Sequence, residues 1–102
     1  MIHVIASITV KPGTRDAYVA AFKKLVPLVL AEKGCIAYGP TLDIQTDIAA
    51  QAPVEPNVVT IVEQWSHVED LKAHLAAPHM ADFRGKNGHM VESLVLKIHQ
   101  PA

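Results

Sequence analysis

Glu63 and His74 are the two side chains in this sequence best suited to proton transfer in an apolar setting. Glu63 alternates with Val59 and Ile61 on one face of a strand, and a carboxylate buried there needs a partner. His74 borders the apolar stripe of a helix, and an imidazole takes up a phenolic proton near neutral pH. We therefore interpret both as catalytic candidates. The structural alternatives are an ion-paired Glu63 at an interface and a hydrogen-bonded core histidine.

Five further residues are candidates for substrate binding. Trp65, the only tryptophan, could stack on an aromatic ring, although a sole tryptophan also commonly fills the core of a small domain. Phe83 is expected in the core or in a pocket wall. His79, Tyr38 and Ser7 could present polar groups to a substrate, with solvent exposure or packing at a sheet edge as their structural alternatives.

A metal site is not expected. His74 and His79 are five residues apart and separated by Pro78, so they lack the i, i+4 spacing that places two imidazoles on one metal, and Glu63 completes only a loose set. Cys35 is the only cysteine, which excludes an internal disulfide and a structural zinc site built on cysteines.

The elements that would position these residues follow from periodicity. Residues 1–10 alternate as a strand, and apolar residues recur at helical spacing after Thr14, which could cap that helix. Residues 36–44 suggest a second strand, but Pro40 restricts it to a sheet edge or a bulge. Residues 46–57 contain two prolines and no period, which predicts a long loop.

The second half repeats the pattern. Residues 58–65 alternate as a third strand, and Ser66–Glu69 has the form of a capping box for a second helix. Pro78 should end or restart that helix, and residues 90–99 form the last strand. The order β-α-β-β-α-β predicts an α+β, ferredoxin-like fold with a four-stranded antiparallel sheet in one domain, residues 1–102.

Two helices cover only one face of a sheet, whereas these strands carry apolar residues on both faces. A second copy of the chain is the simplest cover, so we expect a homodimer that pairs through its sheet faces. The net charge of −1 and the absence of a basic run argue against nucleic-acid binding. The longest apolar stretch, residues 25–31, cannot span a bilayer, and residues 1–10 resemble a strand rather than a signal peptide. We therefore expect a cytoplasmic protein.

Four motifs together resemble the antibiotic biosynthesis monooxygenase superfamily. They are V-K-P-G-x-R-D-A-Y at residues 10–18, E-K-G-C-x-x-Y at 32–38, E-x-W at 63–65 and H-x-x-x-P-H-x-x-x-F at 74–83. The resemblance implies a dimeric α+β barrel with one pocket per protomer, between sheet and helices. It covers nearly the whole chain except the long loop. Members include quinol monooxygenases, and several members of the superfamily use neither metal nor flavin.

The resemblance implies a cofactor-independent monooxygenase that oxidises a quinol-like or polyphenolic small molecule, with O₂ as co-substrate. Such a reaction needs an aromatic site, proton removal, anion stabilisation and exclusion of water. An isomerase or other acid-base enzyme acting on a small carbonyl compound remains an alternative, as does a non-catalytic small-molecule-binding protein. Haem degradation is disfavoured, because neither Ala6 nor Ser7 is the asparagine that haem-degrading relatives carry on the first strand.

Overall fold

The central strand of the fold, β1 (Ile2–Val10), has alternate residues buried along its whole length. In a computed structural model that describes residues 1–102, β1 pairs antiparallel with both β3 (Val58–Trp65) and β4 (Val91–His99). The remaining strand, β2 (Cys35–Thr41), pairs antiparallel with β3. The sheet order is therefore β2-β3-β1-β4, and the predicted ferredoxin-like arrangement is confirmed.

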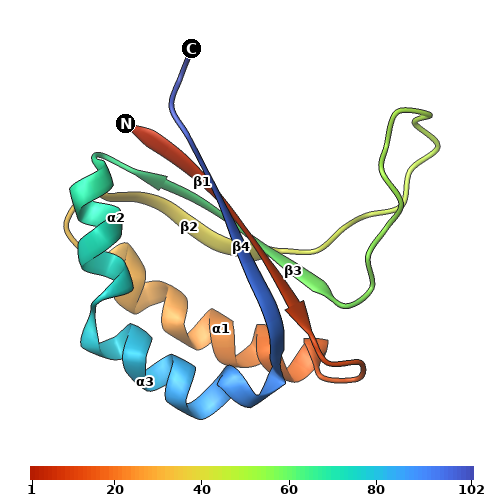
Figure 1. Cartoon of the computed structure of the whole chain (residues 1–102), viewed down its shortest axis with the longest axis horizontal. Helices are drawn as coiled ribbons and strands as arrows, with labels where there is room; N and C mark the ends of the chain where they lie inside the picture. The colour runs from red at the N-terminus through yellow and green to blue at the C-terminus, as the bar shows by residue number, and fades with distance from the viewer.

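The helices gather on one side of this sheet (Figure 1). Helix α1 (Arg15–Leu30) buries the predicted stripe of Tyr18, Phe22, Leu25 and Val29. Pro78 restarts the second helical segment, as one of the two predicted outcomes, which gives α2 (Val68–Leu75) and α3 (Pro78–Asn87), followed by the short 3₁₀ turn η1 (Gly88–Met90). No helix is both long and apolar enough to cross a membrane.

Both predicted helix caps are wrong in their hydrogen bonding. Thr14 precedes α1, but its hydroxyl donates to the Lys11 carbonyl at 2.6 Å instead of capping the helix. Helix α2 begins at Val68 after His67, and no side-chain cap closes the box predicted from Ser66. Both helices still begin where expected: the Thr14 N–H donates to the Lys11 carbonyl before α1, and the Ser66 N–H donates to the Gly34 carbonyl before α2.

Pro40 has the expected effect on β2, which lies at the sheet edge. The strand ends at Thr41, three residues before the predicted end at Ile44. The connection to β3 therefore begins at Leu42 and contains no helix or strand. Figure 1 shows it projecting away from the sheet. Its folded-back path is held by its own contacts, such as the Glu55 N–H donating to Asp43 Oδ2 at 2.8 Å.

The face of β4 turned toward the helices is only partly covered. Leu94 and Ile98 pair with the buried Ile8 and Val4 of β1, yet about half of each side chain is exposed. The helices lie closest to β2 and β3, at the other side of the sheet. The space between sheet and helices is consequently open on the side of β4.

Candidate active site

A cavity of about 310 Å³ lies between the sheet and the helices and opens beside β4. Its walls are mostly apolar, with aromatic rings from three elements. The Phe22 ring stacks on Tyr38 at 5.6 Å between centroids and meets Phe83 edge-on at 5.4 Å. Tyr18 meets Phe83 edge-on at 5.7 Å. Such walls suit a small aromatic compound, which buries apolar area and meets ring edges and faces.

His74 brings an imidazole from the last turn of α2 to this cavity. The ring is 2 % exposed and packs against Trp65 at 4.8 Å between centroids. Its Nδ1 lies 2.8 Å from Glu32 Oε2, so Nδ1–H donates to the carboxylate and Nε2 carries the lone pair. Burial lowers the pKa of His74, and the hydrogen bond that His74 donates to Glu32, together with the charge of Glu32, offsets this only in part. The neutral ring therefore has an acceptor at Nε2.

Nε2 of His74 is free to meet a ligand. It has no hydrogen-bond partner within the protein, and every fully buried side-chain nitrogen or oxygen has one. Nε2 is therefore accessible, and the accessible space that His74 borders is the cavity. A neutral imidazole held by a carboxylate on one nitrogen and open on the other has the arrangement of a general base.

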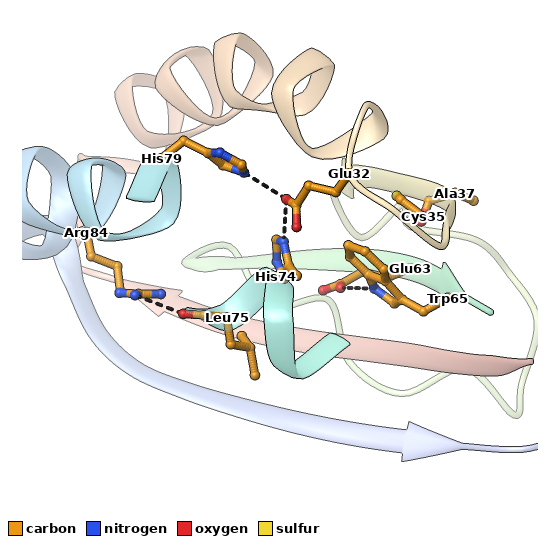
Figure 2. Close-up of polar contacts among 9 residues, drawn as sticks. All are labelled: Glu32, Cys35, Ala37, Glu63, Trp65, His74, Leu75, His79 and Arg84. Carbon is orange, nitrogen blue, oxygen red and sulfur yellow. Dashed lines mark hydrogen bonds and ion pairs between the residues drawn. The ribbon is translucent and has the colours of Figure 1, made fainter. Parts of the chain in front are cut away.

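Glu63, on β3, is the second acid-base group in the wall. Its side chain is 4 % exposed, and its Oε1 accepts the Trp65 indole N–H at 2.9 Å (Figure 2). Burial raises the pKa of Glu63 to about 7, which the Trp65 hydrogen bond counteracts and the charge of Glu32 reinforces. Oε2 has no partner and is accessible by the same reasoning as Nε2 of His74. Glu63 can therefore gain or lose a proton near neutral pH.

Two tyrosine hydroxyls also lack a partner within the protein and belong to cavity residues, Tyr18 and Tyr38. Burial raises the pKa of Tyr18 to about 12. Burial, followed by the charge of Glu63, also raises the pKa of Tyr38. Both phenols therefore stay protonated at neutral pH and can donate hydrogen bonds to a ligand oxygen.

Comparison with known proteins matches this architecture. The family model of the antibiotic biosynthesis monooxygenases matches residues 1–86. The chain belongs to the antibiotic biosynthesis monooxygenase family. "Probable quinol monooxygenase YgiN" from Escherichia coli K12 is 36 % identical over 103 residues, covering 99 % of this chain and 98 % of the relative. At family level these matches support a monooxygenase.

Solved structures agree on the fold. Protein SO0527 from Shewanella oneidensis aligns with a TM-score of 0.78 at 29 % identity, over 97 % of this chain and 89 % of that chain. A conserved protein from Methanosarcina mazei aligns with a TM-score of 0.82 at 22 % identity, over 99 % and 92 % respectively. An antibiotic biosynthesis monooxygenase aligns with a TM-score of 0.79 at 22 % identity, over 100 % and 99 %.

Within this family fold, four of the seven predicted site residues line the cavity: Tyr38, Glu63, His74 and Phe83. Trp65 does not, because it is fully buried behind His74 and Glu63, so it supports these two side chains and cannot stack on a substrate. Ser7 lies on the opposite face, in the cross-strand row with Thr60 and Val95.

His79 also lies outside the main cavity, at the start of α3. Its Nε2 is 2.7 Å from Glu32 Oε2, the same oxygen that His74 contacts (Figure 2). The structure thus gives His79 a contact with Glu32 and no place in the wall of the main cavity. His74 and His79 lack i, i+4 spacing, as the sequence shows, but the break between α2 and α3 still turns both imidazoles toward one carboxylate.

Sequence reasoning missed the role of Glu32, which lies in the turn between α1 and β2. Gly34 fixes this turn, because its φ of +80° suits glycine and a Cβ there would collide with the Asp70 side chain of α2. The Gly34 carbonyl accepts the Ser66 N–H at 2.8 Å. The signal that could have revealed Glu32 is the need of a buried histidine for a hydrogen-bond partner.

Proposed function

We propose that this protein is a cofactor-independent monooxygenase that oxidises a quinol-like or polyphenolic small molecule with O₂. The observation that carries the proposal is the accessible Nε2 of the neutral His74 in an aromatic-walled cavity, with Glu32 on its other nitrogen. The family supports the reaction class, and the printed name of the Escherichia coli relative suggests the quinol substrate.

The reaction balances without a cofactor. A hydroquinone and O₂ give a hydroxyquinone and water: one oxygen atom replaces a ring hydrogen, and the other leaves as water with the two protons. The substrate supplies all four electrons, two in the hydroxylation of the ring carbon and two in conversion of the quinol to the quinone. Deprotonation begins the sequence, because a phenolate gives an electron to O₂ far more readily than a phenol.

The residues that line the cavity, together with Glu32, have distinct roles in this reaction. Nε2 of His74 takes the phenolic proton, and the Glu32 carboxylate stabilises the resulting imidazolium across the Nδ1–H bond. The hydroxyls of Tyr18 and Tyr38 donate to the phenolate oxygen. Glu63, with its pKa of about 7, exchanges a proton with the peroxide intermediate and the departing water. The apolar walls keep bulk water from the anion.

The test is O₂ consumption by chelator-treated protein with a panel of hydroquinones and anthrone-like phenols, corrected for autoxidation. We expect saturable uptake that falls about 10²- to 10⁴-fold in His74→Gln, the range that general-base catalysis contributes. His89→Gln is the matched control, because His89 is exposed on η1, outside the cavity. Uptake that is equal in both variants would remove His74 as the base, and no uptake across the panel would contradict the oxygenase.

The second candidate is an acid-base enzyme, such as an isomerase acting on a small carbonyl compound. The observation that favours it is the pairing of a neutral His74 with a Glu63 whose pKa is about 7, a combination suited to moving protons without O₂. Turnover of a carbonyl substrate under anaerobic conditions would support it. Tight binding of quinols with no turnover of either kind would instead support a binding protein.

We also propose that two copies pair through the sheet face opposite the helices. In its support, Val62, Ile5 and Lys97 form one cross-strand row on that face, next to the row that contains Val95. The side chains of Val62 and Val95 are 45 % and 56 % exposed. Light scattering should give a dimer mass for the wild type and a monomer for Val62→Glu. The matched substitution Val68→Glu, on α2, should leave the dimer intact.

A further inference from the structure

Glu32, His74 and His79 bring one oxygen and two nitrogens together beside the cavity. These ligand atoms all lie within 4.8 Å of one another, although they come from the α1–β2 turn, the end of α2 and the start of α3. Figure 2 shows the Glu32 carboxylate between the two imidazoles. The helix break that aims them is held by the Ala77 N–H, which donates to the His74 carbonyl at 3.0 Å.

The Glu32 carboxylate of this cluster contacts two imidazoles through one oxygen. Both ion-pair partners of Glu32 are histidines, and no lysine or arginine pairs with it. Glu32 and His79 are partly exposed, at 14 % and 27 % of their side chains, so a small cation can reach them from solvent.

Two imidazoles and a carboxylate form a donor set suited to Zn²⁺ and poorly suited to Mg²⁺, which prefers oxygen ligands and retains its water. Ligand atoms around a tetrahedral Zn²⁺ lie about 3.3 Å apart. The two contacts of Glu32 would therefore lengthen by about half an ångström, and the two imidazole nitrogens, now within 4.8 Å of each other, would move closer together. Side-chain rotations of Glu32 and His79, the two partly exposed ligands, would supply these movements. Water or the second Glu32 oxygen can complete the coordination.

We propose that Glu32, His74 and His79 form a Zn²⁺ site, and that its occupation converts His74 from a hydrogen-bond acceptor to a donor in the cavity. Without the metal, the proton on Nδ1 is held by Glu32 and Nε2 is the acceptor. Zn²⁺ needs the lone pair of Nδ1, so the single proton of the neutral ring must move to Nε2. No proton is gained or lost by His74; only its position changes.

The consequence for catalysis rests on the proposed function. With a proton on Nε2, His74 cannot accept one from a phenol, so Zn²⁺ should inhibit turnover. Chelator treatment should then activate protein that has been exposed to Zn²⁺. Inhibition of this kind differs from blockage of the cavity, because the metal sits behind the ring, on its Nδ1 side, and the substrate space remains open.

The first experiment measures Zn²⁺ binding to the metal-stripped, full-length protein by isothermal titration calorimetry. We expect one Zn²⁺ per chain, at least tenfold weaker binding in Glu32→Gln and in His79→Gln, and unchanged binding in His89→Gln. Mg²⁺ should give no signal at the same concentration. His79→Gln keeps the test decisive if Glu32→Gln does not fold, because His79 is the most exposed of the three ligands. Equal affinity in all variants would overturn the site.

The second experiment locates the proton of His74 by long-range ¹H–¹⁵N NMR. We expect Nδ1–H without metal and Nε2–H with Zn²⁺, and a tautomer unaffected by Zn²⁺ would overturn the switch. Turnover is then measured with and without Zn²⁺, each variant relative to its own metal-free rate, with at least tenfold inhibition expected for the wild type and His89→Gln but not for Glu32→Gln or His79→Gln. A tautomer switch without inhibition would uphold the metal site and refute His74 as the base of the proposed function.

Discussion

The two carboxylates near the cavity, Glu32 and Glu63, differ in how the fold supplies them with hydrogen-bond donors. Glu32 lies in a turn and receives two imidazole contacts on one oxygen. Glu63 lies on a central strand, is more deeply buried and receives one indole N–H. Burial with a single donor raises the pKa of Glu63 to about 7. A carboxylate with several donors can thus orient a neighbour, whereas one with a single donor becomes a proton carrier.

The largest expected effect concerns Glu63. The folded-state pKa of Glu63, about 7, lies above the ordinary value of 4.5. The contribution of Glu63 to the free energy of unfolding is therefore fully present below pH 4.5 and is lost as the pH rises through 7. Glu63→Gln does not titrate and avoids this loss. Relative to wild type, we expect the variant to gain about 2 to 3 kcal/mol in free energy of unfolding between pH 5 and pH 8. Urea denaturation at both values checks this.

Glu92→Gln is the control for that experiment, because Glu92 is an exposed carboxylate on β4. Its free energy of unfolding should follow wild type at both pH values. If Glu63→Gln also followed wild type, Glu63 would be ionised normally, and the contrast between the two carboxylates would fail.

Gly34→Ala tests the turn that presents Glu32. The positive φ and the collision with Asp70 should cost about 2 kcal/mol or more in stability, beyond the strain of the left-handed conformation alone. Gly13→Ala is the matched control, because Gly13 has a similar φ of +82° and open space where its Cβ would lie. Thermal melts should separate the two variants, and equal melting temperatures would mean that contact with α2 contributes nothing.

Glu32→Gln tests the orienting role directly. The amide oxygen still accepts one hydrogen bond, but the negative charge that stabilises the imidazolium is lost. We expect about a tenfold lower kcat/KM, equivalent to about 1.4 kcal/mol, in quinol-dependent O₂ uptake at saturating O₂. Circular dichroism controls for folding. An unchanged kcat/KM in a folded variant would show that His74 does not depend on Glu32.

Trp65→Phe should have the smallest effect. It removes the one donor to Glu63 and keeps an aromatic ring against His74, so the pKa of Glu63 should rise further, because that hydrogen bond lowers it. The indole N–H bonds the ionised carboxylate more strongly than the protonated carboxyl by about 1 kcal/mol, so a shift of less than one pH unit is expected. A ¹³C-labelled carboxyl titration by NMR measures it, and a downward shift would contradict the assignment of the donor.

The family fold could be predicted from the sequence because each element carries its own period. Alternation in β1 and β3, the apolar stripe of α1 and the two prolines that restrict β2 and restart α3 are local properties, and the structure confirms them. The helix caps were mispredicted because a side chain of the right type need not make the capping bond: the Thr14 hydroxyl donates to the Lys11 carbonyl instead, and α2 has no side-chain cap.

The same distinction, between local patterns and contacts made only in the folded chain, applies to the candidate site. The sequence by itself determined the strands, helices and apolar faces, and it was sufficient to select His74, Glu63, Phe83 and Tyr38, whose positions on those faces direct them into the cavity. Only the tertiary structure brought Glu32 to His74 and His79, which are 42 and 47 residues away along the chain. No local period encodes such a contact, because it depends on where a turn, a helix end and a helix start meet after the chain has packed.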